Sequence, residues 1–282
     1  MKAKEPTLQD EKQFVNILYY GEPGVGKTTA LAHMASMGKV IFVDAESGLK
    51  SGPLKRLGIP TENIIPRRVI SYPEMEKLHH ELKERLTDEP GSIAGVVLDS
   101  LSEIQRAILE QDAKNPLELS QRDYGTNTQE LRLLIRHFRD LPCHVGFTTH
   151  VRRDQDEDDG TVRYGPSLTP AVGGDLLGYV DLVCYMRALP RAGGGDEPDV
   201  VGAFRPVGKY KAKDRFGALP PVLYDPSFPR VAAYVDGTYL REAQLEADQS
   251  DDVPAGLDPE QYDYRQRVAA AKAATLASKE TS

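Results

Sequence analysis

The chain has 282 residues, a net charge of −8 and two cysteines. The acidic balance excludes a global positive field, so any contact with nucleic acid must come from local basic patches. Cys143 and Cys184 lie far apart without metal-ligand spacing, which indicates a reducing, cytoplasmic setting, and no apolar stretch is long enough to span a bilayer or to act as a signal peptide.

A glycine-rich loop follows the first expected strand, residues 15–20, and precedes a helix that starts near Thr29. Gly21, four further residues and then Gly26-Lys27-Thr28 form the phosphate-loop pattern, whose backbone amides surround phosphate oxygens. A glycine-rich turn with a chance Lys-Thr pair is the alternative, but strand and helix lie on the required sides. We expect Lys27 to reach the β and γ phosphates of ATP and Thr28 to ligate Mg²⁺. The expected nucleotide contacts are Gly21, Glu22, Pro23, Gly24, Val25, Gly26, Lys27, Thr28 and Thr29.

A second strand, residues 39–44, ends in acidic residues. A carboxylate at the carboxyl end of a strand beside a phosphate site is placed to activate water in an open α/β sheet. Glu46 is the candidate for this role. The alternative is that Asp44 or Glu46 caps the following turn.

Residues 64–70 favour a weak strand, and residues 73–86 predict a surface helix with Met75, Leu78, Leu82 and Leu86 on one face. His79 and His80 on that helix are interpreted as solvated residues and not as metal ligands.

A third strand is expected over residues 93–100, with Asp99 near its end. An apolar strand that ends in Asp after a phosphate loop predicts the second nucleotide motif, in which Asp99 holds Mg²⁺ opposite Thr28. A helix should follow, and a second helix is expected over residues 128–141 with Arg132, Arg136 and Arg139 facing outward. This arginine stripe is most simply a solvated face, with contact to DNA or a subunit as the other interpretation.

A fourth strand, residues 144–150, ends in His150, which could sense the γ phosphate or simply be a hydrogen-bonded loop residue. Residues 152–170 are polar and irregular, and Asp159-Gly160 predicts the tip of a hairpin. Such an excursion is either a functional mobile loop or an insertion.

A short helix should begin near Thr169, followed by a strand over residues 180–186 that pairs antiparallel with residues 200–207 across a turn at residues 193–195. In residues 209–216 the four cations Lys209, Lys211, Lys213 and Arg215 occur at every second position. Period two predicts one strand with all four on one face. This face is either a charged edge that discourages aggregation or a set of phosphate contacts, to DNA or to a nucleotide held by a neighbouring subunit.

Three segments organise the chain. We expect an N-terminal extension over residues 1–14, an ATPase core over residues 15–240, and an acidic linker with an alanine-rich, conditionally helical tail over residues 241–282.

The order of these parts resembles the RecA/RadA-type core ATPases, and most closely the compact phage single-strand annealing recombinases of the Sak type. The resemblance covers roughly residues 14–235. It implies that Glu46 is the catalytic glutamate, and it puts His150 where many relatives have a glutamine. Lys213-Asp214-Arg215-Phe216-Gly217 is similar to the Lys-Asn-Arg-Phe-Gly motif of bacterial RadA, which implies that Lys213 and Arg215 act catalytically across a subunit interface.

The segment of residues 152–174 is similar in position to the DNA-binding loop of RecA-like proteins. Candidate DNA contacts are Arg152, Arg153, Arg163, Lys209 and Lys211. The acidic residues between Asp154 and Asp159 fit such a loop poorly, unless they lie at a hairpin tip or repel DNA until a partner neutralises them.

We therefore expect an α/β fold, a RecA-like P-loop core whose mainly parallel sheet is flanked by helices and carries an antiparallel extension. The expected function is ATP-dependent and Mg²⁺-dependent binding of single-stranded DNA, with annealing or strand exchange, as a ring or filament of identical subunits. A single-strand-binding protein is the expected protein partner. A ring helicase or branch-migration ATPase, and a regulatory ATPase of the circadian-clock type without DNA, are the alternatives.

Overall fold

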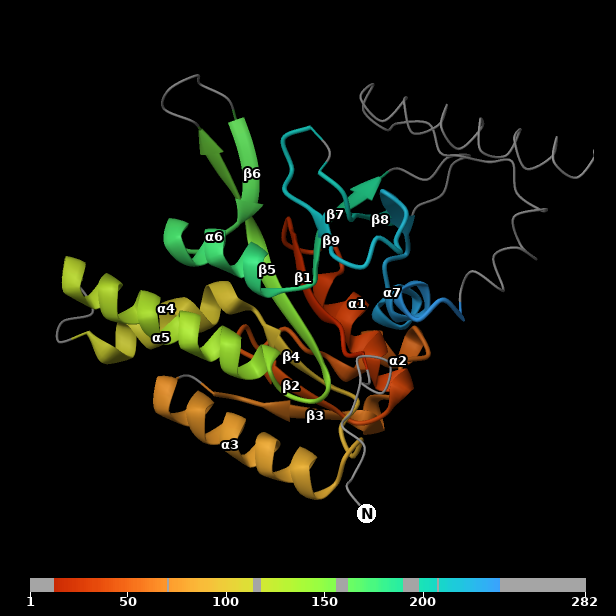
Figure 1. Ribbon diagram of the computed structural model, residues 1–282, viewed down its shortest axis with the longest axis horizontal. Coiled ribbons are helices and arrows are strands. Elements are labelled where there is room, and N and C mark those ends of the chain that lie inside the picture. The colour runs from red at the N-terminus through yellow and green to blue at the C-terminus, as the bar shows by residue number, and fades with distance from the viewer. Residues whose placement is uncertain are drawn as a thin grey trace, which may run out of the picture.

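Ten strands form one sheet in the described part of the chain (Figure 1). The computed structural model describes residues 13–69, 71–113, 118–155, 162–189, 198–206 and 208–238. The strands are β1 (Asn16–Gly21), β2 (Val40–Asp44), β3 (Ile64–Arg67), β4 (Gly95–Asp99), β5 (His144–Gln155), β6 (Val162–Pro166), β7 (Leu182–Leu189), β8 (Asp199–Ala203), β9 (Lys213–Asp214) and β10 (Val222–Tyr224). The spatial order is β10-β8-β7-β1-β5-β4-β2-β3, with β6 beside β5 and β9 beside β7.

The sheet is parallel from β7 to β3 and antiparallel at the margin formed by β8 and β10. β1 lies between β5 and β7 and is parallel to both, and β4, β2 and β3 continue in the same direction. β8 runs antiparallel to β7 and to β10. The expected parallel sheet with an antiparallel extension is therefore confirmed, and so is the antiparallel pairing of the strands after residue 180.

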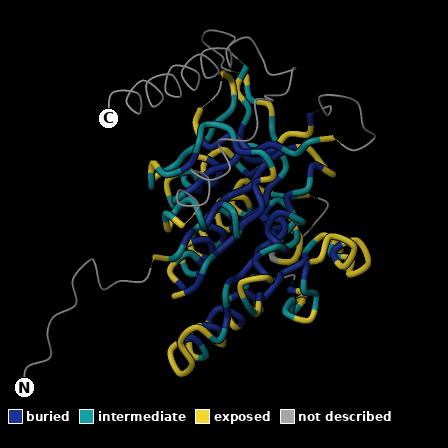
Figure 2. The backbone as a smooth tube through the Cα atoms, turned by 90° about the vertical axis from the view of Figure 1, so that its right-hand side faces the viewer, coloured by how far each residue is buried: buried dark blue, intermediate teal, exposed yellow. Residues whose placement is uncertain are grey.

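Helices cover both faces of the sheet (Figures 1 and 2). One face packs against α3 (Tyr72–Asp88), α4 (Leu101–Asp112), α5 (Gln121–Arg139) and α6 (Pro170–Tyr179), and the other against α1 (Lys27–Ala32), α2 (Ser51–Arg56) and α7 (Phe228–Val235). Short 3₁₀ turns, η1 (His33–Met37) and η2 (Thr61–Asn63), complete the second layer. Along β1, Leu18 and Tyr20 enter the first core, whereas Ile17 and Tyr19 enter the second. Both faces of a central parallel strand are thus apolar, as burial on two sides requires.

A close contact places α1, and with it the loop that precedes it, directly on β5. A Cβ atom at Gly146 would lie 2.5 Å from a methyl group of Leu31. Only a glycine therefore allows this approach.

The helical periodicity gave correct faces and one wrong boundary. Met75, Leu78, Leu82 and Leu86 of α3 are buried as expected. α5 begins at Gln121, seven residues before the predicted start, because Ser120 and Asp123 form a capping box.

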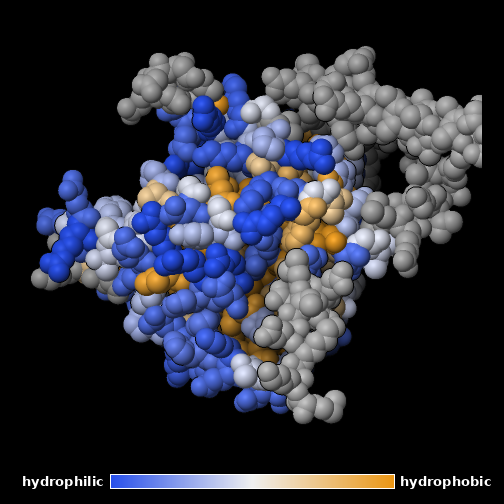
Figure 3. Space-filling model, in the orientation of Figure 1, coloured by the Kyte–Doolittle hydropathy of each residue, from blue (hydrophilic) through white to orange (hydrophobic). Residues whose placement is uncertain are grey.

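Two groups predicted to be solvated make contacts instead. His79 is 8% exposed and its ring stacks on His137 at 5.0 Å between centroids, because α3 packs against α5. In the arginine stripe, Arg132 pairs with Asp175 of α6, and Arg136 and Arg139 lie over the ring of Tyr179. The stripe is the surface on which α6 packs. The rest of this side, over α3, α4 and α5, is largely hydrophilic in Figure 3.

The single strand predicted over residues 209–216 is wrong. Only Lys213 and Asp214 form strand, as β9. Gly208 and Gly217 have positive φ angles, 53° and 65°, which bend the chain on both sides. The Asp214 carboxylate accepts hydrogen bonds from three amides that follow it, which turns the chain away; their residues are Phe216, Gly217 and Leu219. The four cations therefore do not share one face.

Several expectations lie outside the described residues. These are most of the N-terminal extension, the hairpin tip at residues 159–160, the turn at residues 193–195, and the linker and tail after residue 240. Within the described residues, no helix is both long enough and apolar enough to cross a membrane.

Candidate nucleotide-binding site and basic groove

The phosphate loop connects β1 to α1 at the carboxyl end of the strand that lies between β5 and β7. Gly24 and Gly26 have φ angles of 78° and 97°, which cost a glycine nothing and a larger residue much more. A Cβ atom at either position would meet nothing within 4 Å. The loop therefore has the backbone shape and the open space that a phosphate group requires.

The ammonium group of Lys27 lies inside this loop. It donates hydrogen bonds to the carbonyl oxygens of Gly21 and Glu22 at 3.0 and 2.9 Å, and the residue is 7% exposed. Burial lowers the pKa of Lys27, and the nearby carboxylates of Asp99 and Glu46 oppose that shift. A buried ammonium held by two carbonyls fits an anionic phosphate, which would supply the missing counter-charge. The residues present therefore fit the phosphates of ATP.

Asp99 meets two hydroxyl groups at the end of β4. Thr28 donates to its Oδ2 atom at 2.7 Å, and Thr148 of β5 donates to its Oδ1 atom. Burial raises the pKa of Asp99, and the two hydroxyl groups act against that shift. Mg²⁺ in phosphate sites takes few protein oxygens and completes its shell with water and phosphate. Thr28 and Asp99 fit such an ion, and the described residues contain no cluster of three or more His, Cys, Asp or Glu side chains that could hold a metal elsewhere.

Asp44 fills the capping role after β2. Its two carboxylate oxygens accept hydrogen bonds from the amides of Gly48 and Leu49 at 2.9 and 3.0 Å. Ser47, which lies between Asp44 and these two amides, has a φ angle of 56°, and this conformation tightens the turn. Because Asp44 makes this turn, the carboxylate of Glu46 remains for the site.

Glu46 lies in contact with the residue that directly follows β4 and with a residue of β5. The Ser100 hydroxyl donates to Glu46 Oε1, and His150 Nε2 lies 3.1 Å from the same oxygen. The side chains of Glu46 and His150 are each 36% exposed, so both face an accessible space. The structure brings together two residues that the sequence predicted separately, and their chemical roles stay predictions. Ser100 follows Asp99 in the expected second nucleotide motif, but no role was predicted for its hydroxyl.

Helix α4 connects this cluster to the base of the β5–β6 hairpin. The Ser102 hydroxyl accepts a hydrogen bond from the amide of His150 at 3.3 Å and donates to the carbonyl of Ser167 at 2.9 Å. The Ser167 amide in turn donates to the carbonyl of His150 at 2.8 Å. Both sides of the hairpin base are thus tied to the helix that starts after Asp99.

A buried amide network extends the same connection to α6. Gln105 of α4 accepts from the amide of Thr169 at 3.1 Å and donates to the Thr169 hydroxyl at 3.0 Å. It also exchanges hydrogen bonds with Asn127 of α5. Gln105 and Asn127 are 7% and 2% exposed, so the network fixes the three helices relative to one another. Sequence reasoning missed both residues because neither belongs to a motif.

The predicted DNA-binding arginines of the hairpin differ in their contacts. Arg152 pairs with Asp154 at 2.7 Å and donates to the carbonyl of Leu168, so it holds the hairpin to the segment before α6. Arg153 and Arg163 are exposed on β5 and β6. Arg163 stands opposite Asp154 in the strand register.

Lys213 and Arg215 lie at the C-terminus of α6. The Lys213 ammonium donates to three carbonyls at 2.9, 3.3 and 2.7 Å, those of Leu177, Gly178 and Val180. Arg215 pairs with Asp181 at 2.7 Å. β9 pairs with the first residues of β7, whereas the phosphate loop follows the last residue of β1. The two cations therefore lie at the opposite end of the strands from their own phosphate loop, and their expected action across an interface stays a prediction.

Stacked tyrosines join the hairpin to residues 208–213. The ring of Tyr210 stacks on those of Tyr164 and Tyr185, with centroid distances of 4.8 and 3.9 Å. The Tyr164 amide donates to the carbonyl of Lys209 at 2.8 Å, and the Lys211 amide donates to the carbonyl of Tyr164 at 3.3 Å. These contacts position Lys209 and Lys211 beside β6.

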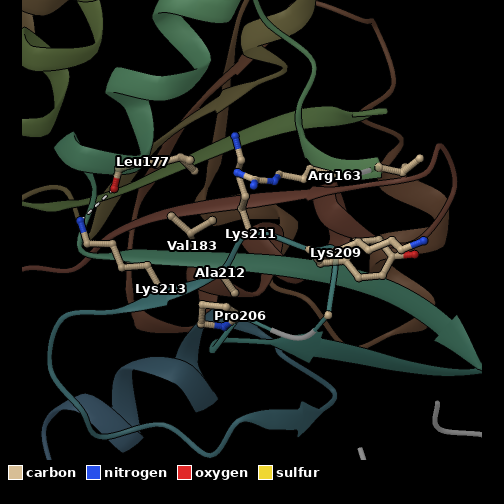
Figure 4. Close-up of a pocket in the computed structure, with 11 residues that line it drawn as sticks. Arg163, Leu177, Val183, Pro206, Lys209, Lys211, Ala212 and Lys213 are labelled. Atoms are coloured by element: carbon tan, nitrogen blue, oxygen red, sulfur yellow. Dashed lines mark hydrogen bonds between the residues drawn. The ribbon is translucent and has the colours of Figure 1, made fainter. Parts of the chain in front are cut away.

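A groove of about 650 Å³ lies between β6 and this segment (Figure 4). Arg163, Lys209 and Lys211 line it from two parts of the sequence, together with apolar side chains such as Val183. The ammonium of Lys213 is directed away, to the carbonyl of Leu177 (Figure 4). We call this the basic groove.

The loop, the strand order and the Asp99 and Glu46 positions define a P-loop ATPase domain. A family model described as an AAA domain (AAA_24) matches residues 13–216, which is more than half of the chain. The chain therefore belongs to this AAA domain family.

RecA and RadB proteins are among its relatives. The RecA protein of Clostridium botulinum (strain Eklund 17B) is 33% identical over 186 residues, which cover 63% of this chain and 48% of that protein. RecA of Geobacter sulfurreducens is 28% identical over 203 residues, 69% and 55% of the two chains. The DNA repair and recombination protein RadB of Methanocaldococcus jannaschii is 27% identical over 126 residues, 42% and 58% of the two chains.

A crystal structure of the RadB recombinase superimposes with a TM-score of 0.48 at 17% identity, over 76% of this chain and 89% of that one. This chain spans about half the length of the curated relatives that it matches. The similarity to RecA supports the RecA-like core that the sequence predicted.

Proposed function

We propose that this chain is an ATP-dependent protein that binds single-stranded DNA and promotes strand annealing or homologous recombination. It acts as an oligomer with ATP and Mg²⁺ at the subunit interfaces, and within the RecA-like class it is of the phage Sak-type annealing kind. A single-strand-binding protein is its expected partner.

The observation that carries this proposal is the course of β5. The strand passes Thr148, which donates to Asp99, then His150, which contacts Glu46, and continues without a break into Arg152 and Arg153. One continuous strand therefore connects the position expected for the γ phosphate to the hairpin that carries Arg152 and Arg153. Ordering of a segment by a γ phosphate is a common form of nucleotide switch. Further support comes from the RecA and RadB relatives.

Fluorescence anisotropy of a labelled single strand, with and without a non-hydrolysable ATP analogue, tests the proposal. Binding should need the analogue and should weaken with salt at a slope that corresponds to fewer than about six phosphate contacts, because the chain is acidic overall. An annealing time course with complementary strands measures the activity, and electron microscopy of the same complex identifies a ring or a filament. Lys27→Ala is the matched control, since it should remove the nucleotide response.

An ATP-bound, folded chain that neither binds single strands at low salt nor speeds annealing contradicts this function. A regulatory ATPase whose nucleotide state controls a protein partner would then replace it.

A further inference from the structure

We propose that the basic groove binds the sugar-phosphate backbone of single-stranded DNA, with Lys209, Lys211 and Arg163 at the phosphates. This inference rests on the proposed function and adds a location to it. The sequence predicted a single strand with all four cations on one face. The proposed site is instead built from β6 and from residues 208–213, which are distant in sequence.

The two lysines of the groove are available to bind an anion. Within the described residues, the ammonium groups of Lys209 and Lys211 have no hydrogen-bonded or ion-paired partner. The side chain of Lys211 runs over the backbone of Gly165, and its Nζ atom lies 3.7 Å from where a Cβ of Gly165 would stand. Arg163 lies two residues earlier on the same strand. Lys211 and Arg163 therefore both reach this part of the groove, from two distant segments of the chain (Figure 4).

The site is held rigidly although its cations are long side chains. Tyr210 is fixed between two aromatic rings, and the Tyr20 hydroxyl donates to the carbonyl of Lys211 at 2.5 Å. Because Tyr20 belongs to β1, directly before the phosphate loop, the lysine backbone is anchored to the centre of the sheet. Anchoring of this kind lowers the entropy lost when the lysines bind a ligand.

The size and lining of the groove favour a nucleic-acid strand over a single small anion. Its volume of about 650 Å³ is far larger than one phosphate requires, and the lining alternates cations with apolar surface. The apolar residues are Val162, Leu177, Val183, Pro206 and Ala212. A positively charged groove that follows the phosphates is a usual part of single-strand sites. The groove also borders β6, which pairs with the part of β5 that directly follows His150.

The test compares two double variants with equal loss of charge. Lys209→Gln/Lys211→Gln removes the groove lysines, and Lys55→Gln/Lys83→Gln removes two exposed lysines of α2 and α3 that lie away from the groove. Anisotropy with labelled single-stranded DNA and an ATP analogue is measured over a range of salt. The groove variant should bind about 10-fold more weakly or worse, and its log-log salt slope should fall by about 1.4, since two contacts each contribute about 0.7 for single strands. The control variant should show the slope of the unchanged chain, and thermal melting confirms that both variants are folded.

Three results overturn the inference and are distinguishable. If the unchanged chain binds DNA and both double variants bind alike, the strand lies elsewhere while the proposed function stands. If the groove variant loses ATP hydrolysis but keeps its DNA affinity, the phosphate in the groove belongs to a neighbour's nucleotide. If the unchanged chain, shown to bind ATP, binds no DNA at all, the proposed function fails together with the groove.

Discussion

The phosphate loop and the C-terminus of α6 each hold a lysine by backbone carbonyls. Lys27 donates to two carbonyls of its loop, and Lys213 donates to three at the end of the helix. Burial lowers the pKa of both ammonium groups. The contacts of the two ammonium groups are alike, but the carbonyls belong to a loop in one case and to the end of a helix in the other.

The carbonyls at the end of a helix have no intrahelical partners, so Lys213 satisfies groups that would otherwise lack a hydrogen bond. The carbonyls around Lys27 belong to a loop with open space beside Gly24 and Gly26. A phosphate bound in that space can replace the carbonyls as the hydrogen-bond acceptor of the Lys27 ammonium. The same hydrogen bonds therefore stabilise the end of a helix in one region and hold a lysine beside a candidate phosphate site in the other.

The largest expected effect tests the chemistry beside the phosphate loop. Glu46→Gln keeps the shape of the side chain but removes the base that would act on water, so ATP hydrolysis should slow by about 10² to 10⁴-fold. ATP affinity should change little, as measured by equilibrium binding of a fluorescent ATP analogue. An equal loss of affinity and hydrolysis would remove Glu46 from this role.

The next effect concerns Lys27 as a ligand-binding lysine. Lys27→Ala should weaken ATP binding by about 10 to 100-fold, because a charge-assisted hydrogen bond is worth about 1.5–3 kcal/mol. Without nucleotide its melting temperature should hardly fall. A large loss of stability without nucleotide would show that Lys27 stabilises its loop much as Lys213 stabilises the end of α6. The proposed difference between the two lysines would then be wrong.

A subunit-mixing experiment tests whether Arg215, at the C-terminus of α6, also acts on a nucleotide bound by a neighbouring subunit. If Arg215 completes a neighbour's site, mixing Arg215→Ala with Lys27→Ala subunits should restore part of the ATPase activity, since some interfaces then combine an intact loop with an intact arginine. The measurement is the steady-state ATPase rate against mixing ratio. No recovery, with mixed oligomers demonstrated, would leave Arg215 with its contacts to Asp181 and to the carbonyl of Gly178.

Lys213 should matter mainly for stability. Lys213→Met leaves three carbonyls without their donor and should lower the free energy of unfolding by about 1–3 kcal/mol. Urea unfolding measures this loss, with Lys211→Met as a control of equal charge. The two variants should separate clearly, and equal stabilities would refute the helix-capping role.

The smallest expected effect is a pH dependence shared by both lysines. Each has a folded pKa below the unfolded value of 10.5. In the interval between these values the unfolded chain binds more protons, so stability rises with pH there and is lost as pH falls through the folded pKa. Lys27→Met and Lys213→Met should each reduce this rise in urea unfolding measured towards pH 10. ATP should cancel the Lys27 part alone, because phosphates favour the charged ammonium.

Some features of this protein follow from the sequence alone because they depend on short stretches of chain. The phosphate loop needs particular glycines at fixed spacing between a strand and a helix. Asp99, Glu46 and His150 were found because the carboxyl ends of parallel strands meet at one edge of a sheet. The buried faces of α3 and α5 follow from helical period in the same way.

Other features depend on contacts between distant segments, which no local pattern encodes. The conformation of residues 208–217 is decided by two left-handed glycines, the Asp214 turn and the stack of Tyr164, Tyr210 and Tyr185. The cations do occur at every second position, but residues 209–216 do not form the continuous strand that would put them on one face. Gln105 pairs with Asn127 and Thr169 only because three helices meet on one face of the sheet. The contact of Lys213 with the end of α6 was likewise decided by the position of that helix, since only the folded chain brings those carbonyls within reach.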